Sequence, residues 1–310
     1  MNRTLAGVAK RTLLSARHYH RRLAAHAVPG VVVLCYHGVR PDALPARAMP
    51  FKALHVRESE LEAHCRLIRE TCQPISLQTW RHAAAGTASL PSRPILFTFD
   101  DGYRTVMTLA RPILERYGIP AVFFVCTGPV RRRALTWYDA VARRCGEREA
   151  ERLKHVPFRE WKFITDELVT PVRADDPAAL LTASEIRLLA HRPDFEIGAH
   201  TVDHPILAAA DVEDQRRQIM DSKAELERWT GRPVKAFAYP NGDVRDYTTD
   251  TVRIVEEAGF DVAFTTRPRL ATAAEPALER SRYVMLTGVT AAELAHRLSY
   301  SWRHGWSVAV

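Results

Sequence analysis

Short apolar segments rich in β-branched and aromatic residues recur along the chain, and polar segments with helical periodicity separate several of them. The apolar segments predict buried strands at 31–36, 95–99, 121–126, 195–199, 234–239 and 261–265. The helical pattern covers 57–71, 103–117, 182–191, 211–230 and 247–258. Strands that alternate with helices indicate parallel βαβ units. Six or more such units could close into a (β/α) barrel.

The N-terminal residues carry an amphipathic pattern of their own. Apolar positions recur at steps of three and four residues, at Leu5, Val8, Thr12, Ala16, Tyr19 and Leu23. Basic side chains occupy the opposite face, at Arg3, Lys10, Arg17 and Arg21. We therefore expect one helix over 3–25, ended by Pro29-Gly30, and divide the chain into a basic helical segment (1–28) and a barrel domain (29–310). Such a helix could lie on an anionic membrane surface or pack on the barrel, and the pattern allows both.

Residues 127–181 interrupt the alternation of strands and helices. The stretch contains an amphipathic helix near 137–153 and a polar run at 173–177, so we predict an insertion over one end of the barrel. Trp137 and Tyr138 could line a sugar site from this insertion, because flat aromatic faces suit the C–H surfaces of sugars. Large aromatic residues also fill cores, and the sequence leaves both interpretations open.

Composition and charge narrow the class of protein. The chain has 310 residues and a net charge of +8, and residues 1–28 hold basic side chains but no acidic one. The remainder is nearly balanced and carries no nucleic-acid motif, so we expect no nucleic-acid partner. The five cysteines form no CxxC pair, which favours a reducing compartment. We see neither a transmembrane segment nor an export signal, and we expect a cytoplasmic protein that could be peripheral on the inner membrane face.

Two adjacent acids, Asp100 and Asp101, follow the strand predicted at 95–99. Catalytic groups of parallel α/β domains sit at the carboxyl ends of strands. Two adjacent carboxylates repel each other, which raises the pKa of one unless a cation lies nearby. One acid could then bind the cation while the other stays free as a base. The alternative is an acidic turn whose aspartate caps a helix.

Two histidines, His200 and His204, follow the strand predicted at 195–199. Their spacing of four would place both imidazoles on one face of a helical turn, which suits a divalent metal. Because both pairs follow strands, they should open on the same face of the barrel. Asp101, His200 and His204 would then supply three ligands, a set that favours Zn²⁺ without excluding other divalent ions.

These motifs resemble those of a known family. Thr98-Phe99-Asp100-Asp101-Gly102 and His200-Thr201-x-x-His204 are similar to the first two motifs of the polysaccharide deacetylases (the NodB-homology domain, carbohydrate esterase family 4). The segment 237–242, Phe-Ala-Tyr-Pro-Asn-Gly, resembles the third motif, and the similarity covers roughly residues 31 to 285. The resemblance implies a distorted (β/α)7 barrel and hydrolysis of N-acetyl groups on sugars.

The resemblance also implies roles for single residues. Asp100 resembles the catalytic base, and Asp101, His200 and His204 resemble the metal ligands. A backbone N–H at Asn241, after the strand end at Tyr239, would contact the oxyanion, and we count both residues as candidates for the substrate or oxyanion site. This chemistry is coherent in itself, because a metal polarises the amide and activates water while a carboxylate takes the proton.

The sequence departs from the family pattern in two places. Ala238 stands where many members carry an arginine that pairs with the base, and we find no late Leu-x-His to supply the acid. The branch resembled here places an arginine on the last strand, where Arg280 fits best. We therefore predict that Arg280 keeps Asp100 ionised, the alternative being a solvated arginine. His37, after the strand at 31–36, could be the acid or a substrate contact, or a structural histidine.

The sequence thus predicts a metal-dependent hydrolase that removes N-acetyl groups from an amino sugar in a polysaccharide or a lipid-linked glycan. One alternative is a deformylase of a lipid-linked amino sugar, which would use the same site. The other is a non-catalytic glycan-binding barrel. Asp100 speaks against a pure binder, which needs no base beside its metal. The sequence leaves the exact sugar and the oligomeric state open.

Overall fold

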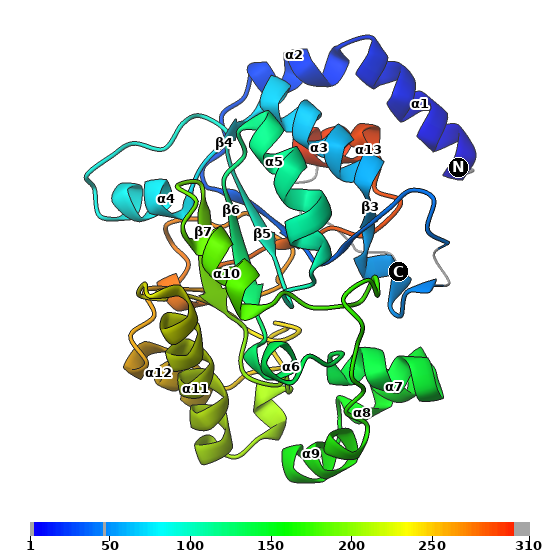
Figure 1. Cartoon of the computed structure of the whole chain (residues 1–310). Helices are drawn as coiled ribbons and strands as arrows, with labels where there is room; N and C mark the ends of the chain where they lie inside the picture. Colours follow the sequence, from blue (N-terminus) through cyan, green and yellow to red (C-terminus); the bar gives the residue numbers. More distant parts are fainter. Residues whose placement is uncertain (1–2, 46–47, 301–310) are drawn as a thin grey trace.

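The computed structural model describes residues 3–45 and 48–300 and shows a curled parallel sheet surrounded by helices (Figure 1). The strands run in the order β10-β1-β5-β6-β7-β8-β9, with β4 paired to β5 off this path. Their bounds are β1 (Val32–Tyr36), β4 (Gln73–Pro74), β5 (Pro94–Phe99), β6 (Ala121–Val125), β7 (Phe195–Ala199), β8 (Ala236–Ala238), β9 (Val262–Phe264) and β10 (Tyr283–Val284). A separate parallel pair consists of β2 (Val39–Arg40) and β3 (Val56–Arg57). All six strands predicted from the sequence are present.

The segment 280–284 closes the sheet into a ring. Arg280 forms a parallel bridge with Phe264 of β9, and Tyr283 and Val284 pair with β1. Seven strand segments therefore surround one axis. The predicted distorted (β/α)7 barrel is confirmed, and the short segment that joins β9 to β1 accounts for the distortion.

Alternate residues of each strand face the barrel interior or the helices outside. Val33, Leu96, Phe124 and Phe264 form the inner core, whereas neighbours such as Phe97 pack against the outer helices. Because side chains alternate with a period of two, this register decides which residue at each strand end points into the barrel mouth.

The outer helices also follow the predicted pattern. They are α3 (Glu58–Thr71), α4 (Leu77–Ala84), α5 (Arg111–Tyr117), α10 (Ala183–Ala190), α11 (Val212–Thr230), α12 (Thr249–Glu257) and α13 (Ala291–Tyr300). Short 3-10 turns lie at Lys52–Leu54, Leu207–Ala209 and Ala277–Glu279. The helix predicted at 103–117 is partly wrong, because Val106–Ala110 is π-helical. Pro112 has no N–H to bond the carbonyl four residues earlier, which accounts for the irregular turn.

Helix α4 covers the amino end of the barrel. Arg81 pairs with Glu196 of β7 and with Asp261 just before β9, both near the starts of their strands. Trp80 packs on Phe264 inside the ring. The opposite end, where the carboxyl ends of the strands lie, therefore remains for the functional side chains.

The insertion folds into α6 (Thr127–Arg132), α7 (Trp137–Cys145), α8 (Glu147–Leu153) and α9 (Phe158–Glu167). Helices α7 to α9 form a group beside the barrel (Figure 1) with a core of its own that includes Trp137, Leu153 and Trp161. The helix predicted near 137–153 is two helices, because Gly146 adopts a φ of 92° between them. Only glycine enters that region without strain.

The N-terminal segment also forms two helices, α1 (Arg3–Ser15) and α2 (His18–Ala24), so the single helix predicted over 3–25 is wrong. Arg17 lies between them with a φ of 58°, a left-handed conformation that cannot continue a right-handed helix. Tyr19 and Leu23 of α2 are buried, whereas Leu5 of α1 is 66% exposed. Both helices pack against α13 (Figure 1), where Lys10 pairs with Glu293. Among the described residues, no helix has the length and apolar character needed to cross a membrane.

Candidate active site

A small cavity of about 60 Å³ opens at the carboxyl ends of the strands. Its lining includes the predicted base and the predicted metal ligands, which are Asp100, Asp101, His200 and His204. Two further candidates from the sequence, His37 and Asn241, also line it. Parallel strands end at one edge of a sheet, and this geometry brings together residues that are far apart in the chain.

Asp101, His200 and His204 form a buried group of potential metal ligands. Asp101 Oδ1 lies 3.5 Å from His200 Nε2 and 3.6 Å from His204 Nε2. This oxygen is buried and has no hydrogen-bond partner among the described residues. His200 Nδ1 lies 2.7 Å from Ala238 O, and donation to this carbonyl leaves Nε2 free as a ligand. An orphaned carboxylate oxygen facing two imidazoles fits a divalent metal.

The pKa values of His204 and Asp101 agree with such a site, whereas Asp101 and Asp100 outweigh burial at His200 and raise its pKa in the absence of a metal. Burial, with a contribution from the neighbouring His200, lowers the pKa of His204 to about 3, so the His204 imidazole is neutral and able to bind a metal. Burial alone would raise the pKa of Asp101, but the imidazoles around it hold the pKa below its ordinary value. Asp101 is therefore an anion that faces two nitrogen ligands.

The loops at the cavity contain left-handed backbone at several residues other than glycine. Asp101 has a φ of 73°, Thr201 of 65°, His204 of 58° and Asn241 of 58°. Each such residue costs free energy, on the order of 1 kcal/mol or more, and persists only where surrounding contacts hold it. All four belong to the segments that line the cavity, so the strained backbone shapes this one site.

The two histidines do not lie on a helical turn, and that part of the prediction is wrong. Residues 200–206 form an irregular loop, and their rings meet at 4.8 Å because the loop curls back. The amide of His204 donates to Thr201 Oγ1, and Gln218 Oε1 accepts from the amides of Val202 and Asp203. Side chains, rather than helical hydrogen bonds, therefore maintain the spacing.

Asp100 is paired with Arg282. The guanidinium of Arg282 donates to both carboxylate oxygens at 2.7 Å, and it also donates to Thr98 Oγ1 and Thr265 O. Both partners are buried, Arg282 completely. Burial is the largest influence and raises the pKa of Asp100, but Arg282 together with His200 and His37 outweighs it and holds the pKa below its usual range. Asp100 is thus an ionised carboxylate beside the metal-ligand group, as a base requires.

The predicted pairing of Arg280 with Asp100 is wrong. Arg280 donates to Thr272 O and lies over the ring of Trp80 at 5.6 Å. The two arginines are two residues apart, so they share one side of the segment, but Arg280 lies roughly 7 Å nearer the amino end of the barrel. Because side chains alternate along a strand, the sequence allowed either arginine to face Asp100. Only the register of the closing segment decides between them.

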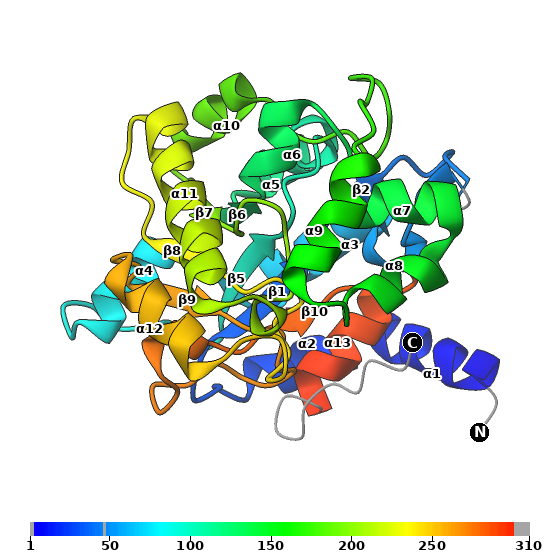
Figure 2. The ribbon, with the colours of Figure 1, turned by 90° about the horizontal axis from the view of Figure 1, so that it is seen from below.

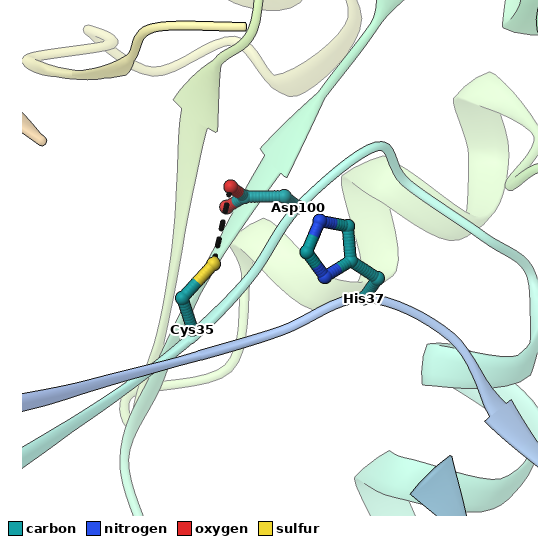
Figure 3. A group of neighbouring side chains, drawn as sticks. All are labelled: Cys35, His37 and Asp100. Atoms are coloured by element: carbon teal, nitrogen blue, oxygen red, sulfur yellow. Dashed lines mark hydrogen bonds between the residues drawn. The ribbon is translucent and has the colours of Figure 1, made fainter. Parts of the chain in front are cut away.

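Cys35 and His37 form a second group with Asp100, in which potential ligand atoms lie within 4.8 Å of one another. Figure 3 shows the Cys35 thiol pointing at the Asp100 carboxylate, to which it donates at 3.3 Å, with the His37 ring alongside. Burial raises the pKa of Cys35, so the thiol stays protonated. A cation here would be repelled by the Arg282 guanidinium. The group therefore forms a hydrogen-bonded setting for Asp100, and Cys35 was missed because the sequence shows only a cysteine in an apolar strand.

The insertion contributes directly to the cavity. Tyr138 of α7 packs edge-on against His204 at 5.1 Å, and Lys154 beyond α8 reaches the lining. Trp137 belongs to the insertion core, and its indole N–H donates to His204 O at 3.0 Å. Both residues therefore belong to the insertion core, where Trp137 supports the histidine loop and Tyr138 is in addition a wall of the cavity.

The two candidates in the third motif, Asn241 and Tyr239, occupy different places in the structure. Asn241 lines the cavity, and its carbonyl accepts from Thr266 Oγ1. Tyr239 points away from the cavity, where its hydroxyl donates to Leu278 O and its ring stacks on Tyr247. The prediction for Tyr239 is wrong because Ala238 is the neighbour that faces inward.

Comparison with known proteins shows the family of this chain. The family described as polysaccharide deacetylase matches residues 87–263. A sequence relative is the poly-beta-1,6-N-acetyl-D-glucosamine N-deacetylase of Escherichia coli (strain K12), 25% identical over 256 residues that cover 79% of this chain and 35% of that protein. This chain therefore spans about a third of the length of that relative.

Two solved structures share the fold. The Streptococcus pyogenes deacetylase PplD in complex with acetate superposes with a TM-score of 0.66 at 20% identity, covering 88% of this chain and 99% of that one. IcaB from Ammonifex degensii gives 0.62 at 23% identity, with the same two coverages. At these identities the likeness concerns the barrel and not the substrate.

Proposed function

Because this chain belongs to the polysaccharide deacetylase family, hydrolases of carbon–nitrogen bonds, we propose that it is a metal-dependent enzyme that removes N-acetyl groups from an amino sugar in a polysaccharide or lipid-linked glycan. The observation that carries the proposal is an ionised, buried Asp100 beside the ligand group Asp101, His200 and His204 in one cavity. The E. coli relative is named for deacetylation of poly-β-1,6-N-acetylglucosamine, which supports N-acetylglucosamine as the sugar.

In this mechanism Asp101, His200 and His204 would hold the metal, for which two imidazoles and one carboxylate favour Zn²⁺. A metal in this position supplies Lewis acidity and lowers the pKa of a bound water. Asp100, kept ionised by Arg282, accepts the proton of the attacking water. The backbone N–H of Asn241 would face the developing oxyanion.

We assign the general acid to His37. Its ring lies in the cavity beside Asp100, and its Nδ1 is buried without a hydrogen-bond partner among the described residues. Cleavage of the amide needs an acid, because the amine of the sugar leaves poorly without a proton. Cleavage of 4-nitrophenyl acetate does not, because 4-nitrophenolate leaves without protonation. His37→Gln should therefore lose far more activity on an N-acetylated glycan than on 4-nitrophenyl acetate. Equal losses on both substrates would remove His37 from this role.

The function is tested by metal analysis combined with release of acetate from N-acetylglucosamine oligomers of β-1,6 and β-1,4 linkage. Asp100→Asn should keep its metal and lose about 10²–10⁴-fold in turnover, the usual contribution of a general base. Asp243→Asn, which changes a surface carboxylate whose ion-pair partner among the described residues is Arg245, is the matched control. Turnover that survives in Asp100→Asn would contradict the mechanism, and formate in place of acetate would identify a deformylase.

We also propose that α1 contacts the cytoplasmic face of the inner membrane, where a lipid-linked glycan would be available. Leu5, Val8 and Leu13 are 66%, 48% and 37% exposed, and at 100° per residue they lie within about 140° of one another on the helix. Arg11 is exposed at the edge of this apolar face and would meet anionic lipid headgroups.

Co-sedimentation with vesicles tests this contact. The wild type should sediment with vesicles that contain phosphatidylglycerol and much less with pure phosphatidylcholine. Replacing Leu5, Val8 and Leu13 together by Gln should abolish binding, whereas Leu188→Gln, which removes an exposed apolar residue of α10, should not. Vesicle binding that is unchanged in the triple variant, or a fully soluble protein in fractionated cells, would contradict the proposal.

A further inference from the structure

A second and larger cavity lies outside the barrel, between α6, α10 and α11 and the end of the insertion near residues 172–174. Helices α10 and α11 contact each other, and α11 also contacts α6 (Figure 2). Its volume is about 480 Å³, and it shares no lining residue with the active-site cavity. The volume is within the range of small-molecule sites.

The cavity has a strong excess of positive charge. Its lining contains one carboxylate, Glu225, and five arginines: Arg104, Arg131, Arg133, Arg173 and Arg228. Arg104 and Arg173 pair with Glu185 and Asp175, which are not part of the lining.

Of the three remaining arginines, two share the single carboxylate of the lining. Glu225 is buried and accepts from Arg131 at 3.2 Å and from Arg228 at 3.4 Å. Arg133 makes no side-chain hydrogen bond or ion pair within the part of the chain that the structure describes. Two guanidiniums therefore share one anion while a third arginine lines the same cavity, an arrangement that an additional carboxylate or phosphate would complete.

The walls of the cavity are largely apolar. Val130, Val172, Leu180 and Trp229 contribute to the lining, and the indole of Trp229 is only partly buried. A bare inorganic anion would leave these surfaces uncovered. A sugar ring has C–H faces that pack on aromatic and aliphatic side chains while its hydroxyls remain in water.

We propose that this cavity binds a sugar that carries an anionic group, with the phosphate or carboxylate held by Arg131, Arg133 and Arg228 and the ring against Trp229. This inference goes beyond deacetylation and does not depend on it.

The walls of this cavity are joined to the active-site loops by backbone hydrogen bonds. Gly128 N in α6 donates to Val202 O in the histidine loop at 2.8 Å, and Leu181 N donates to Gly102 O, next to Asp101, at 2.9 Å. A ligand between these walls would restrain both loops that carry the metal-ligand group.

Calorimetric titration of the full chain tests the proposal with four probes: glucose 6-phosphate, glucuronate, inorganic phosphate and uncharged glucose. We expect saturable binding of one of the two anionic sugars, and which one binds identifies phosphate or carboxylate as the recognised group. Inorganic phosphate should bind more weakly than the sugar that carries the anion, and glucose should not bind detectably. No saturable binding of either anionic sugar, or equal affinity for inorganic phosphate, would overturn the proposal.

Variants locate the binding. Arg228→Gln and Arg133→Asn should each weaken it about tenfold, as expected for loss of one charge-assisted hydrogen bond. Asparagine is chosen at Arg133 because it tolerates the left-handed backbone there, with a φ of 53°. Arg187→Gln, which removes an exposed arginine of α10 outside the cavity, should bind as the wild type does. Binding that is unchanged in both cavity variants would place the anion elsewhere and refute the assignment. Because binding is measured without turnover, this result is independent of whether the chain releases acetate.

Discussion

Replacing Arg282 by Met tests how the base is kept ionised. Arg282 is completely buried and donates to both oxygens of Asp100 at 2.7 Å. Methionine is apolar and unbranched, so it can fill much of the same space without supplying a charge. The substitution therefore leaves Asp100 in its buried position and removes its only guanidinium partner among the described residues.

The expected magnitude follows from the burial of both partners. Removing one member of a buried ion pair typically costs about 3–5 kcal/mol of stability, because the other charge remains desolvated. Asp100 can avoid part of this cost by taking up a proton, since burial is the largest influence on its pKa and raises it. Protonated Asp100 cannot act as a base, so turnover at neutral pH should fall by about 10²–10⁴-fold.

The pH dependence of kcat/KM and the pH dependence of Tm both report the protonation of Asp100. The acidic limb of kcat/KM should move to higher pH in Arg282→Met, so that activity is partly recovered at alkaline pH. In the wild type the pKa of Asp100 is lowered on folding, so the stabilisation is present above the pKa of an unfolded aspartate and is lost as the pH falls through the folded pKa. The difference in Tm between wild type and variant should therefore shrink in acid.

Arg280→Met is the matched control. It removes an arginine from the same segment, but one that bonds Thr272 O and lies over Trp80 without touching Asp100. The acidic limb of the kcat/KM profile of Arg280→Met should coincide with that of the wild type. The reasoning fails if Arg282→Met keeps the wild-type pH profile, or if Arg280→Met shifts it equally.

Further variants probe the surroundings of the site. His204→Ala should lower the metal content of the purified protein well below one equivalent, and full occupancy by elemental analysis would exclude His204 as a ligand. Trp137→Phe removes the donor to His204 O and should weaken metal binding about 10–100-fold in a chelator competition, while an unchanged affinity would mean that this hydrogen bond does not position the ligand. Cys35→Ala should reduce kcat more than Cys35→Ser, because serine retains a donor to Asp100, and equal rates would contradict that role. Burial raises the pKa of Asp139 to about 7, so wild-type stability should fall relative to Asp139→Asn by roughly 1.4 kcal/mol per pH unit between about pH 4 and 7. A Tm difference that is constant over this range would contradict the shift.

Much of the fold was predictable because its information is local. Segment 195–199 is a strand with the predicted bounds, and the pattern at 211–230 became α11 with one residue of difference. Burial on both faces of a parallel sheet requires continuous apolar segments, which are visible without a partner strand. The grouping of Asp101 with His200 was predictable for the same reason, since Asp100-Asp101 and His200 come at the ends of such segments.

Other features escaped the sequence because they depend on how distant segments meet. Arg280 and Arg282 are two residues apart and share one side of the closing segment. Only the register of this segment brings Arg282 to Asp100, which is 182 residues away in the chain. The separation of His200 and His204 resembled a helical turn, but a left-handed loop held by Gln218 produces it.

The sequence by itself therefore determined the order of the elements and the residues at the strand ends, because hydrophobic periodicity and strand termini are properties of neighbouring residues. The tertiary structure decided which arginine pairs with Asp100, that Cys35 donates to Asp100, and that Tyr138 and Lys154 of the insertion reach the cavity. These facts depend on strand register and loop conformation, which arise only when the whole barrel closes.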